Sequence, residues 1–225
     1  MQPVLLDFQT AEFPDPKHGL DEPDGLLAVG GNLLPATILS AYYQGIFPWY
    51  NDDDPILWWS PSSRCVIVPS NLHLSKSLKK QIRKKQFTIS VNQAFSEVIH
   101  ACAERKPYEG TWINDEMIEA YSALHHLGRA HSLEVWFEGD LIGGIYGLAI
   151  GGIFCGESMF SRAANGSKIA LVYLCEHLVK LGFSLLDCQL VNDHLLSMGA
   201  QSMDRSDFLA KLYESRDKTI DWLIS

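Results

Sequence analysis

The sequence lacks two features that would place the protein in a membrane or outside the cell. The longest uncharged apolar run, LIGGIYGLAIGGIFC, has 15 residues, whereas a membrane-spanning helix needs about 20. The first residues, MQPVLLDFQTAEFPDP, contain acids and lack the cationic-then-apolar order of a secretory signal. We therefore expect an unexported, cytoplasmic protein.

Cysteine is scarce and does not follow a metal-binding pattern. The five cysteines are odd in number and form no CxxC pair, and the eight histidines show no zinc spacing. We expect reduced thiols in a packed core and no metal. The serine motif GxSxG is also absent, because the nearest stretch reads GESMF, which argues against a serine hydrolase.

The overall composition predicts a globular protein. With 225 residues and 47% hydrophobic content, the chain can form one large or two small domains. The first sixty residues are rich in proline, glycine and aromatics and contain one predicted helix, from about Ala36 to Gln44. We place a domain boundary near Pro61, which gives a small N-terminal domain over residues 1–61 and a larger domain over 62–225.

Acidic residues are missing from Pro55 to Ser96, while seven cations occur there. This segment carries +7, so the rest of the chain carries −9 − 7 = −16. Six of the cations lie in SKSLKKQIRKKQF, residues 75–87. Leu74, which precedes this stretch, recurs every four residues with Leu78 and Ile82, and this spacing predicts a helix with its cations in solvent. A solvated helix face is one interpretation. We favour contact with a polyanion such as nucleic acid, because no acids alternate with the cations to form pairs within the helix.

The rest of the chain predicts an α+β fold. Helices are expected at about residues 92–102, 115–126 and 167–181. Three strands separated by turns at Gly139-Asp140 and Gly151-Gly152 form an antiparallel meander, and SLLDCQL forms a further strand. This order resembles the acyl-CoA N-acyltransferase (GNAT-type) architecture, with a mostly antiparallel sheet flanked by helices.

The strand SLLDCQL contains the first candidate catalytic residues. Its period of two places Asp187 and Gln189 on one face, among apolar neighbours. A buried Asp is costly unless it is paired, so it either forms a structural ion pair or is presented to a reacting group. We favour the second interpretation. Glu157, in the stretch GESMFSR, is a further candidate.

The loop RAANGS before the last long helix could bind a phosphate through its free N–H groups. It fits the pyrophosphate pattern of acyl-CoA enzymes imperfectly, since one glycine position is missing. An ordinary helix start explains it equally well.

Long blocks of the sequence resemble one family, the leucyl/phenylalanyl-tRNA–protein transferases. The matching blocks, in order from about Phe13 to Phe208, are DGLLAVGGNL, AYYQGIFPWY, PILWWSP, GTWIN with DEMIEAYSALHHLG, AHSLEVW, GGIYGLAIGGIFCGESMFSR, SKIAL and DCQ with HLLSMGA. The resemblance implies a small N-terminal domain joined to a GNAT-like domain. It also implies transfer of Leu, Phe or sometimes Met from aminoacyl-tRNA to proteins with N-terminal Arg or Lys, which marks them as N-degron substrates for proteolysis.

The resemblance also assigns roles to individual residues. Phosphates near the tRNA 3′ end would be held by Lys76, Lys79, Lys80, Arg83 and Lys84. Asp187 and Gln189 would handle the proton and align the amine, with Asp187 acting either as a base or by orienting Gln189. Glu157 would position the aminoacyl-adenosine end, and Trp49 and Trp112 match aromatics near it. The aminoacyl side-chain pocket would comprise Ile145, Phe154, Leu171 and Leu174.

Two of these pocket residues, Ile145 and Leu174, replace the Met and Phe that other members often carry, which leaves the choice between Leu and Phe open. The stretch WWSPSSR also departs from the usual WWSPDPR.

The resemblance implies a reaction that needs no ATP, metal or other cofactor, because an aminoacyl ester is already activated. The expected partners are charged tRNA and acceptor proteins, and the expected state is a monomer. Two other functions stay open from the sequence: an acetyl-CoA-dependent N-acetyltransferase and a noncatalytic tRNA-binding module.

Overall fold

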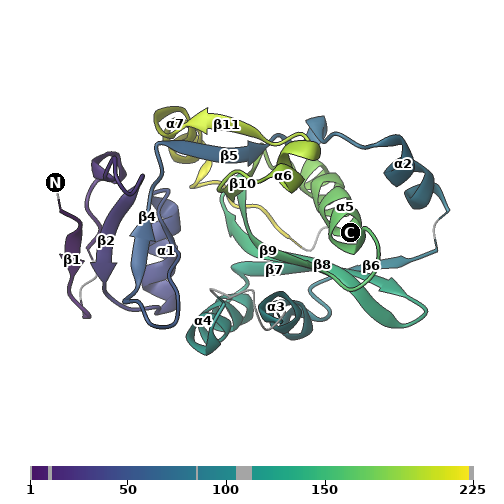
Figure 1. The fold of residues 1–225 in the computed structure, drawn as a ribbon, viewed down its shortest axis with the longest axis horizontal. Helices are drawn as coiled ribbons and strands as arrows, with labels where there is room; N and C mark the ends of the chain where they lie inside the picture. The colour runs from purple at the N-terminus through teal and green to yellow at the C-terminus, as the bar shows by residue number, and fades with distance from the viewer. Residues whose placement is uncertain (1, 10–11, 85, 105–112, 223–225) are drawn as a thin grey trace.

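The computed structural model describes residues 2–9, 12–84, 86–104 and 113–222, and they form two sheets (Figure 1). The smaller sheet has the strand order β1-β2-β4-β3. Its elements, together with a short 3₁₀ turn at Pro16–His18, are β1 (Val4–Leu6), β2 (Leu26–Gly30), α1 (Pro35–Tyr43), β3 (Phe47–Pro48) and β4 (Leu57–Trp59). This sheet ends at Trp59, and the chain joins the larger sheet at Ser63. The boundary near Pro61 stays a prediction.

The larger sheet has seven strands in the order β11-β5-β10-β9-β8-β7-β6. Its strands are β5 (Ser63–Ile67), β6 (Thr88–Val91), β7 (Ala130–Phe137), β8 (Asp140–Ile150), β9 (Ile153–Ser161), β10 (Leu185–Gln189) and β11 (Gln201–Asp204). All neighbouring pairs are antiparallel except β9 and β10, which are parallel. The predicted α+β class with a mostly antiparallel sheet is confirmed, and the three-strand meander forms β7, β8 and β9.

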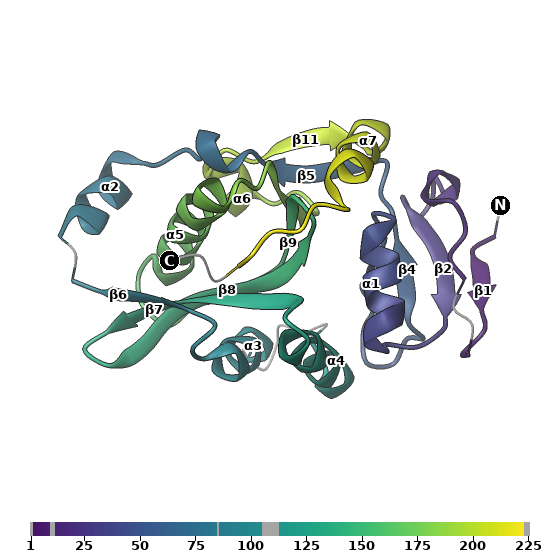
Figure 2. The same cartoon turned by 180° about the vertical axis from the view of Figure 1, so that it is seen from behind.

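Helices cover both faces of the larger sheet. Its helices, together with a 3₁₀ turn at Pro69–Asn71, are α2 (Lys76–Arg83), α3 (Phe95–Ala103), α4 (Asp115–His126), α5 (Gly166–Leu181), α6 (Asp193–Ser197) and α7 (Arg205–Ser215). Figures 1 and 2 show α3 and α4 on one face and α5 on the other. No helix in the described ranges is both long and apolar enough to cross a bilayer.

One predicted helix starts later than expected. Helix α3 begins at Phe95 and not at Asn92, because Asn92 adopts a left-handed backbone with φ of 57°. Its side-chain oxygen accepts a hydrogen bond from the Ser132 N–H at 3.0 Å. Asn92 therefore ties the end of β6 to β7 before the helix can start.

The cores of the two parts meet at the N-terminal end of the meander. Trp58 of β4 is fully buried and donates through Nε1 to the carbonyl of Gly30 at 2.9 Å. Tyr42 of α1 is also buried, and its hydroxyl lies 2.7 Å from that of Tyr121 in α4. The first contact lies within the small sheet, whereas the second joins α1 to helix α4 of the larger domain, beside the cavity described next.

Candidate active site

A cavity forms where β9 and β10 diverge. The two strands pair only from Ile153 to Cys155 and from Leu185 to Asp187. Beyond this register, a cavity of about 270 Å³ opens between the strands, α5 and α6. A second cavity of about 190 Å³ adjoins it beside β3. Because four residues line both spaces, namely Glu157, Cys188, Gln189 and Asn192, we treat them as two lobes of one site.

Glu157 and Gln189 are in direct contact where the lobes meet. The Nε2 of Gln189 donates to Oε1 of Glu157 at 3.2 Å, and the hydroxyl of Tyr121 donates to Oε2 at 3.0 Å. Tyr121 in turn contacts Tyr42. Burial raises the pKa of Glu157 to about 8, although hydrogen bonds from the tyrosines lower it. The structure thus brings together two of the three predicted catalytic residues at the lobe junction.

Asp187 lies behind this junction and does not line either lobe. It is fully buried, and both carboxylate oxygens accept from Arg64: Oδ1 from Nε at 2.8 Å and Oδ2 from Nη2 at 2.7 Å. Its Oδ1 also accepts from the backbone N–H of Gln189 at 3.0 Å. A register shift separates Asp187 from Gln189, whose φ is 55°. The simple alternation expected from the sequence is therefore interrupted, and Gln189 reaches the cavity while Asp187 does not.

Arg64 is one of the site residues that sequence reasoning missed. It belongs to the cation-rich segment but is only 2% exposed, and its guanidinium is sandwiched between the rings of Phe47 and Phe208 at 4.7 and 4.6 Å. Burial alone would lower the pKa of Arg64, but the adjacent Asp187 carboxylate outweighs this and raises it. No local signal marks this residue, because its partner lies 123 positions away.

Apolar side chains form part of the wall of the larger lobe. These are Ile145, Met159, Leu171, Leu186 and Leu195. Two of the four residues expected in the aminoacyl pocket, Ile145 and Leu171, therefore lie in this wall. The other two predicted pocket residues, Phe154 and Leu174, are buried in the same core cluster but lie outside the wall.

The smaller lobe contains one of the two predicted aromatics. Trp49 is 42% exposed and lines this lobe together with Phe47, Pro48 and Leu190. Its position is fixed by Trp59, which donates through Nε1 to the Trp49 carbonyl at 2.6 Å. The second aromatic, Trp112, lies outside the described residues.

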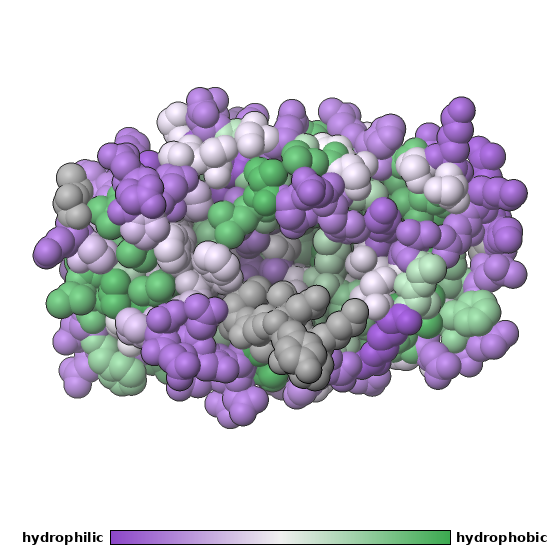
Figure 3. All heavy atoms as spheres, viewed as in Figure 1, coloured by the Kyte–Doolittle hydropathy of each residue, from purple (hydrophilic) through white to green (hydrophobic). Residues whose placement is uncertain are grey.

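The predicted cationic helix forms as α2. Ser75 caps it by accepting from the Leu78 N–H, and Leu78 is buried. The cationic ridge is the exposed set Lys76, Lys79, Lys80, Arg83 and Lys84. None of the five forms an ion pair with an acid in the described part of the chain. Figure 3 shows hydrophilic side chains gathered over this end of the molecule.

Helix α2 is tied to the strand that carries Glu157. Gln81 donates to the Ala164 carbonyl at 3.2 Å and accepts from the Asn165 side chain at 2.7 Å. These residues lie in the loop that follows Ser161 at the end of β9. From Glu157 to Ser161 the strand rises about 13 Å at roughly 3.3 Å per residue. The ridge therefore stands beyond the end of the strand that leads out of the cavity.

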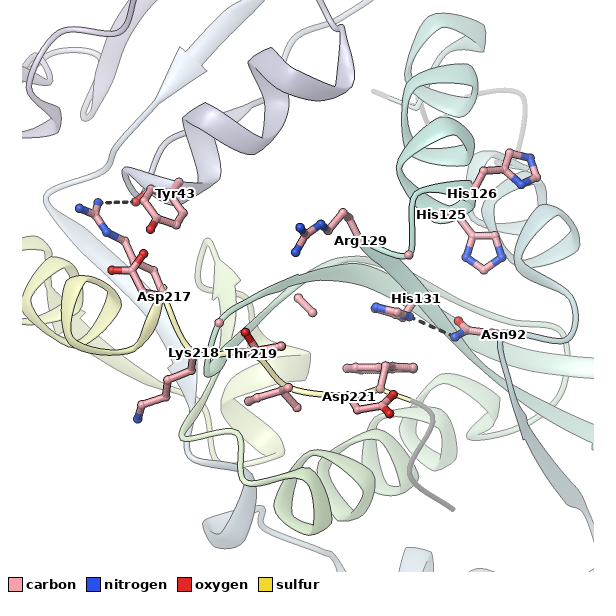
Figure 4. Close-up of a pocket in the computed structure, with 16 residues that line it drawn as sticks. Tyr43, Asn92, His125, His126, Arg129, His131, Asp217, Lys218, Thr219 and Asp221 are labelled. Atoms are coloured by element: carbon pink, nitrogen blue, oxygen red, sulfur yellow. Dashed lines mark hydrogen bonds between the residues drawn. The ribbon is translucent and has the colours of Figure 1, made fainter.

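A larger cavity, of about 730 Å³, contains none of the predicted site residues. It lies between the end of α4, the start of β7 and the segment after α7 (Figure 4). His131 lines this cavity. Its Nδ1 lies 3.0 Å from Nδ2 of Asn92, and its ring stacks on that of Trp222. Burial lowers the pKa of His131 to about 3. No group of three or more potential metal ligands occurs within the described residues.

Comparisons with known proteins identify the family of this chain. The family model described as leucyl/phenylalanyl-tRNA protein transferase matches residues 66–213, and the model of its N-terminal domain matches 31–62. A leucyl/phenylalanyl-tRNA–protein transferase from Shewanella pealeana is 56% identical over 216 residues, covering 96% of this chain and 92% of that protein. One from Aliivibrio salmonicida is 55% identical over 93% of this chain and 89% of that protein.

Among solved structures, FemX is similar at 11% identity and a TM-score of 0.48, over 64% of this chain and 60% of that chain. The two family models together match most of the chain, and the two relatives share more than half of their aligned residues with it. The chain therefore belongs to the leucyl/phenylalanyl-tRNA–protein transferase family.

Proposed function

We propose that this protein, an aminoacyltransferase by family, transfers leucyl or phenylalanyl groups from tRNA to the α-amine of acceptor proteins. The observation that carries the proposal is the two-lobed cavity, which combines an apolar lobe with a polar junction formed by Glu157 and Gln189. In the finer form of the proposal, the acceptors begin with Arg or Lys, and the product is an N-degron substrate for proteolysis.

The larger lobe is suited to an aminoacyl side chain. Four aliphatic side chains form part of its wall, and its volume of about 270 Å³ can enclose a leucine or phenylalanine side chain. Shape discriminates weakly between such side chains, at about 1–3 kcal/mol per methylene. The smaller lobe, with the exposed indole of Trp49, is suited to the terminal adenosine, because a flat ring stacks on a base.

With these two placements, the ester carbonyl lies at the lobe junction. The Nε2 of Gln189 donates to Glu157, so its amide oxygen is turned away from that carboxylate and can accept from the incoming amine. In this scheme Asp187 orients Gln189. Its carboxylate accepts a hydrogen bond from the backbone N–H of Gln189 and is itself fixed by two hydrogen bonds from Arg64. This favours the orienting role over the base role for Asp187.

The cationic ridge on α2 is proposed to hold phosphates near the tRNA 3′ end. Five exposed cations on one short helix can neutralise backbone charge without reading bases. That property is useful to an enzyme that accepts several leucine and phenylalanine tRNAs. The remaining chain is acidic, which favours the approach of an acceptor with a cationic N-terminus.

We further propose that the protein acts as a cytoplasmic monomer. Cys65, Cys155, Cys175 and Cys188 form no disulfide in the described part of the chain, which suits a reducing compartment where charged tRNA is made.

The test is a transfer reaction with purified protein, radiolabelled leucyl-tRNA and a peptide beginning with Arg, without ATP or CoA. Label should move from tRNA to the peptide. Peptides beginning with Asp or with an acetylated N-terminus serve as controls and should stay unlabelled. No labelled product would overturn the proposal, and acetylation of the peptide by acetyl-CoA alone would support an acetyltransferase. Gln189→Ala should lower turnover at least about tenfold while tRNA affinity stays within twofold.

A further inference from the structure

Aminolysis of an aminoacyl ester requires a proton carrier, and this inference rests on the function proposed above. The acceptor nitrogen forms a bond to the carbonyl carbon, and the bond from that carbon to the tRNA O3′ breaks. The nitrogen loses a proton and O3′ gains one, so the reaction balances without a cofactor. A single group that faces both atoms could take the first proton and return it to the leaving oxygen.

Among the described residues, those at the lobe junction are placed to face both atoms. They are Glu157, Cys188, Gln189 and Asn192. The two amides do not titrate, and a hydrogen bond with Cys65 together with burial raises the pKa of the Cys188 thiol. Asp187 lines neither lobe, and both of its oxygens accept from Arg64.

We infer that Glu157 carries the proton from the acceptor amine to the tRNA O3′, and that Tyr121 is the positioning residue for its carboxylate. Tyr121 donates to Oε2 and Gln189 donates to Oε1. Each oxygen therefore keeps further acceptor capacity. Tyr42 supports Tyr121 from the other side, so helices α1 and α4 hold the carboxyl group against β9.

The proton affinity of Glu157 suits this role. Burial raises its pKa to about 8, which is close to the 7.7 to 8 typical of an α-amine. Proton transfer between the two groups is then nearly balanced in both directions. The titratable and charged groups that face Glu157 are Tyr42 of α1, Arg64 of β5, Tyr121 of α4, Tyr146 of β8, Cys155 of β9, and Asp187 and Cys188 of β10.

Few of these neighbours can change charge near pH 8. Burial raises the pKa of all three tyrosines and of Cys155 well above their ordinary values. Arg64 and Asp187 neutralise each other through two hydrogen bonds. A kinetic pKa near 8 that responds to changes around the carboxylate would therefore report on Glu157.

The experiment compares pH profiles of kcat for three variants with saturating leucyl-tRNA and Arg-peptide. Glu157→Gln, which keeps the size of the side chain, should lower kcat by about 10² to 10⁴-fold and leave only the pH dependence of the peptide α-amine, with tRNA affinity within about twofold. Tyr121→Phe should move the rise near pH 8 to higher pH. The hydrogen bond from Tyr121 lowers the pKa of Glu157 in the wild type, so its removal raises that pKa. The α-amine of the peptide is unchanged in that variant.

Tyr146→Phe is the matched control. Its ring packs edge-on against Tyr121 with centroids 5.8 Å apart, and its buried hydroxyl has no hydrogen-bond partner in the described part of the chain. Its profile should match that of wild type. Activity of Glu157→Gln within tenfold of wild type, or a Tyr121→Phe profile that rises at the same pH as wild type, would overturn the inference. Failure of the proposed function would differ, because wild type itself would then form no product.

Discussion

The buried ion pair between Arg64 and Asp187 gives the sharpest stability prediction. Both side chains are almost fully excluded from solvent, so Arg64→Met leaves an unpaired carboxylate in the core. Removal of one partner from such a pair costs about 3–5 kcal/mol, a large part of the roughly 5–15 kcal/mol that stabilises a typical fold. With a urea m-value of about 2 kcal/mol/M, the midpoint should fall by about 2 M.

The double variant Arg64→Met/Asp187→Leu separates folding from catalysis. It removes both charges, so we expect it to recover about half of the lost free energy of unfolding. The Gly45 carbonyl and the Gln189 N–H still lose their partners. Because Gln189 is no longer held in its left-handed conformation, kcat should stay at least about tenfold below wild type even where the variant is fully folded.

Urea unfolding followed by tryptophan fluorescence measures the first effect, and the leucyl transfer assay measures the second. Arg162→Met is the control: Arg162 and Glu104 also pair at 2.9 Å, but their side chains are 47% and 65% exposed. That variant should lose no more than about 1 kcal/mol. The reasoning is refuted if Arg64→Met loses no more than this control, or if the double variant has the kcat of wild type.

Three further predictions concern the ridge, the carboxylate and the apolar lobe. If about four phosphates are engaged, a fourfold rise in salt concentration should weaken tRNA binding about 50-fold. In a variant with Lys76, Lys80 and Arg83 neutralised together, the same rise should weaken binding only about threefold. An unchanged salt dependence of tRNA binding in a filter-binding assay would contradict the role of the ridge. The raised pKa of Glu157 means that the folded state binds more protons than the unfolded state between about pH 4.5 and 8. The free energy of unfolding should therefore fall as pH rises through that window, by at most about 1.4 kcal/mol per unit. Urea denaturation at pH 5 and pH 9 measures this change, and the free energy of unfolding of Glu157→Gln should fall less between the two pH values than that of wild type. Equal decreases in the two proteins would argue against a raised pKa of Glu157. Ile145→Ala should widen the apolar lobe and raise the ratio of phenylalanyl to leucyl transfer by about tenfold, whereas an unchanged kcat/KM ratio would exclude Ile145 from selectivity.

Local patterns were sufficient for the regular elements. Asn114, the apolar stripe through Tyr121 and the stop at Gly128 predict helix α4 from Asp115 to His126, as the structure has it. The glycine turns likewise predict the boundaries of the meander. These signals lie within a few residues of the structure they determine, because a cap, a periodic face and a turn are short-range features.

The candidate site depended on contacts between distant parts of the chain. The sequence singled out Glu157 and Gln189, and they are in contact although 32 positions separate them. It did not indicate Tyr42, which reaches Tyr121 across 79 positions. The alternation that grouped Asp187 with Gln189 did not anticipate the register shift between them.

By itself, the sequence determined helix α4, the meander of β7, β8 and β9, strand β10, the cation-rich face of α2 and the residue types available for chemistry. The tertiary structure alone decided which acid faces the cavity. Asp187 forms a buried ion pair with Arg64 behind the strand, whereas Glu157 lines the cavity between β9 and β10. The physical reason is that the environment of a carboxyl group is set by neighbours from β5, α1 and α4, and the spacing of residues along one strand carries no information about them.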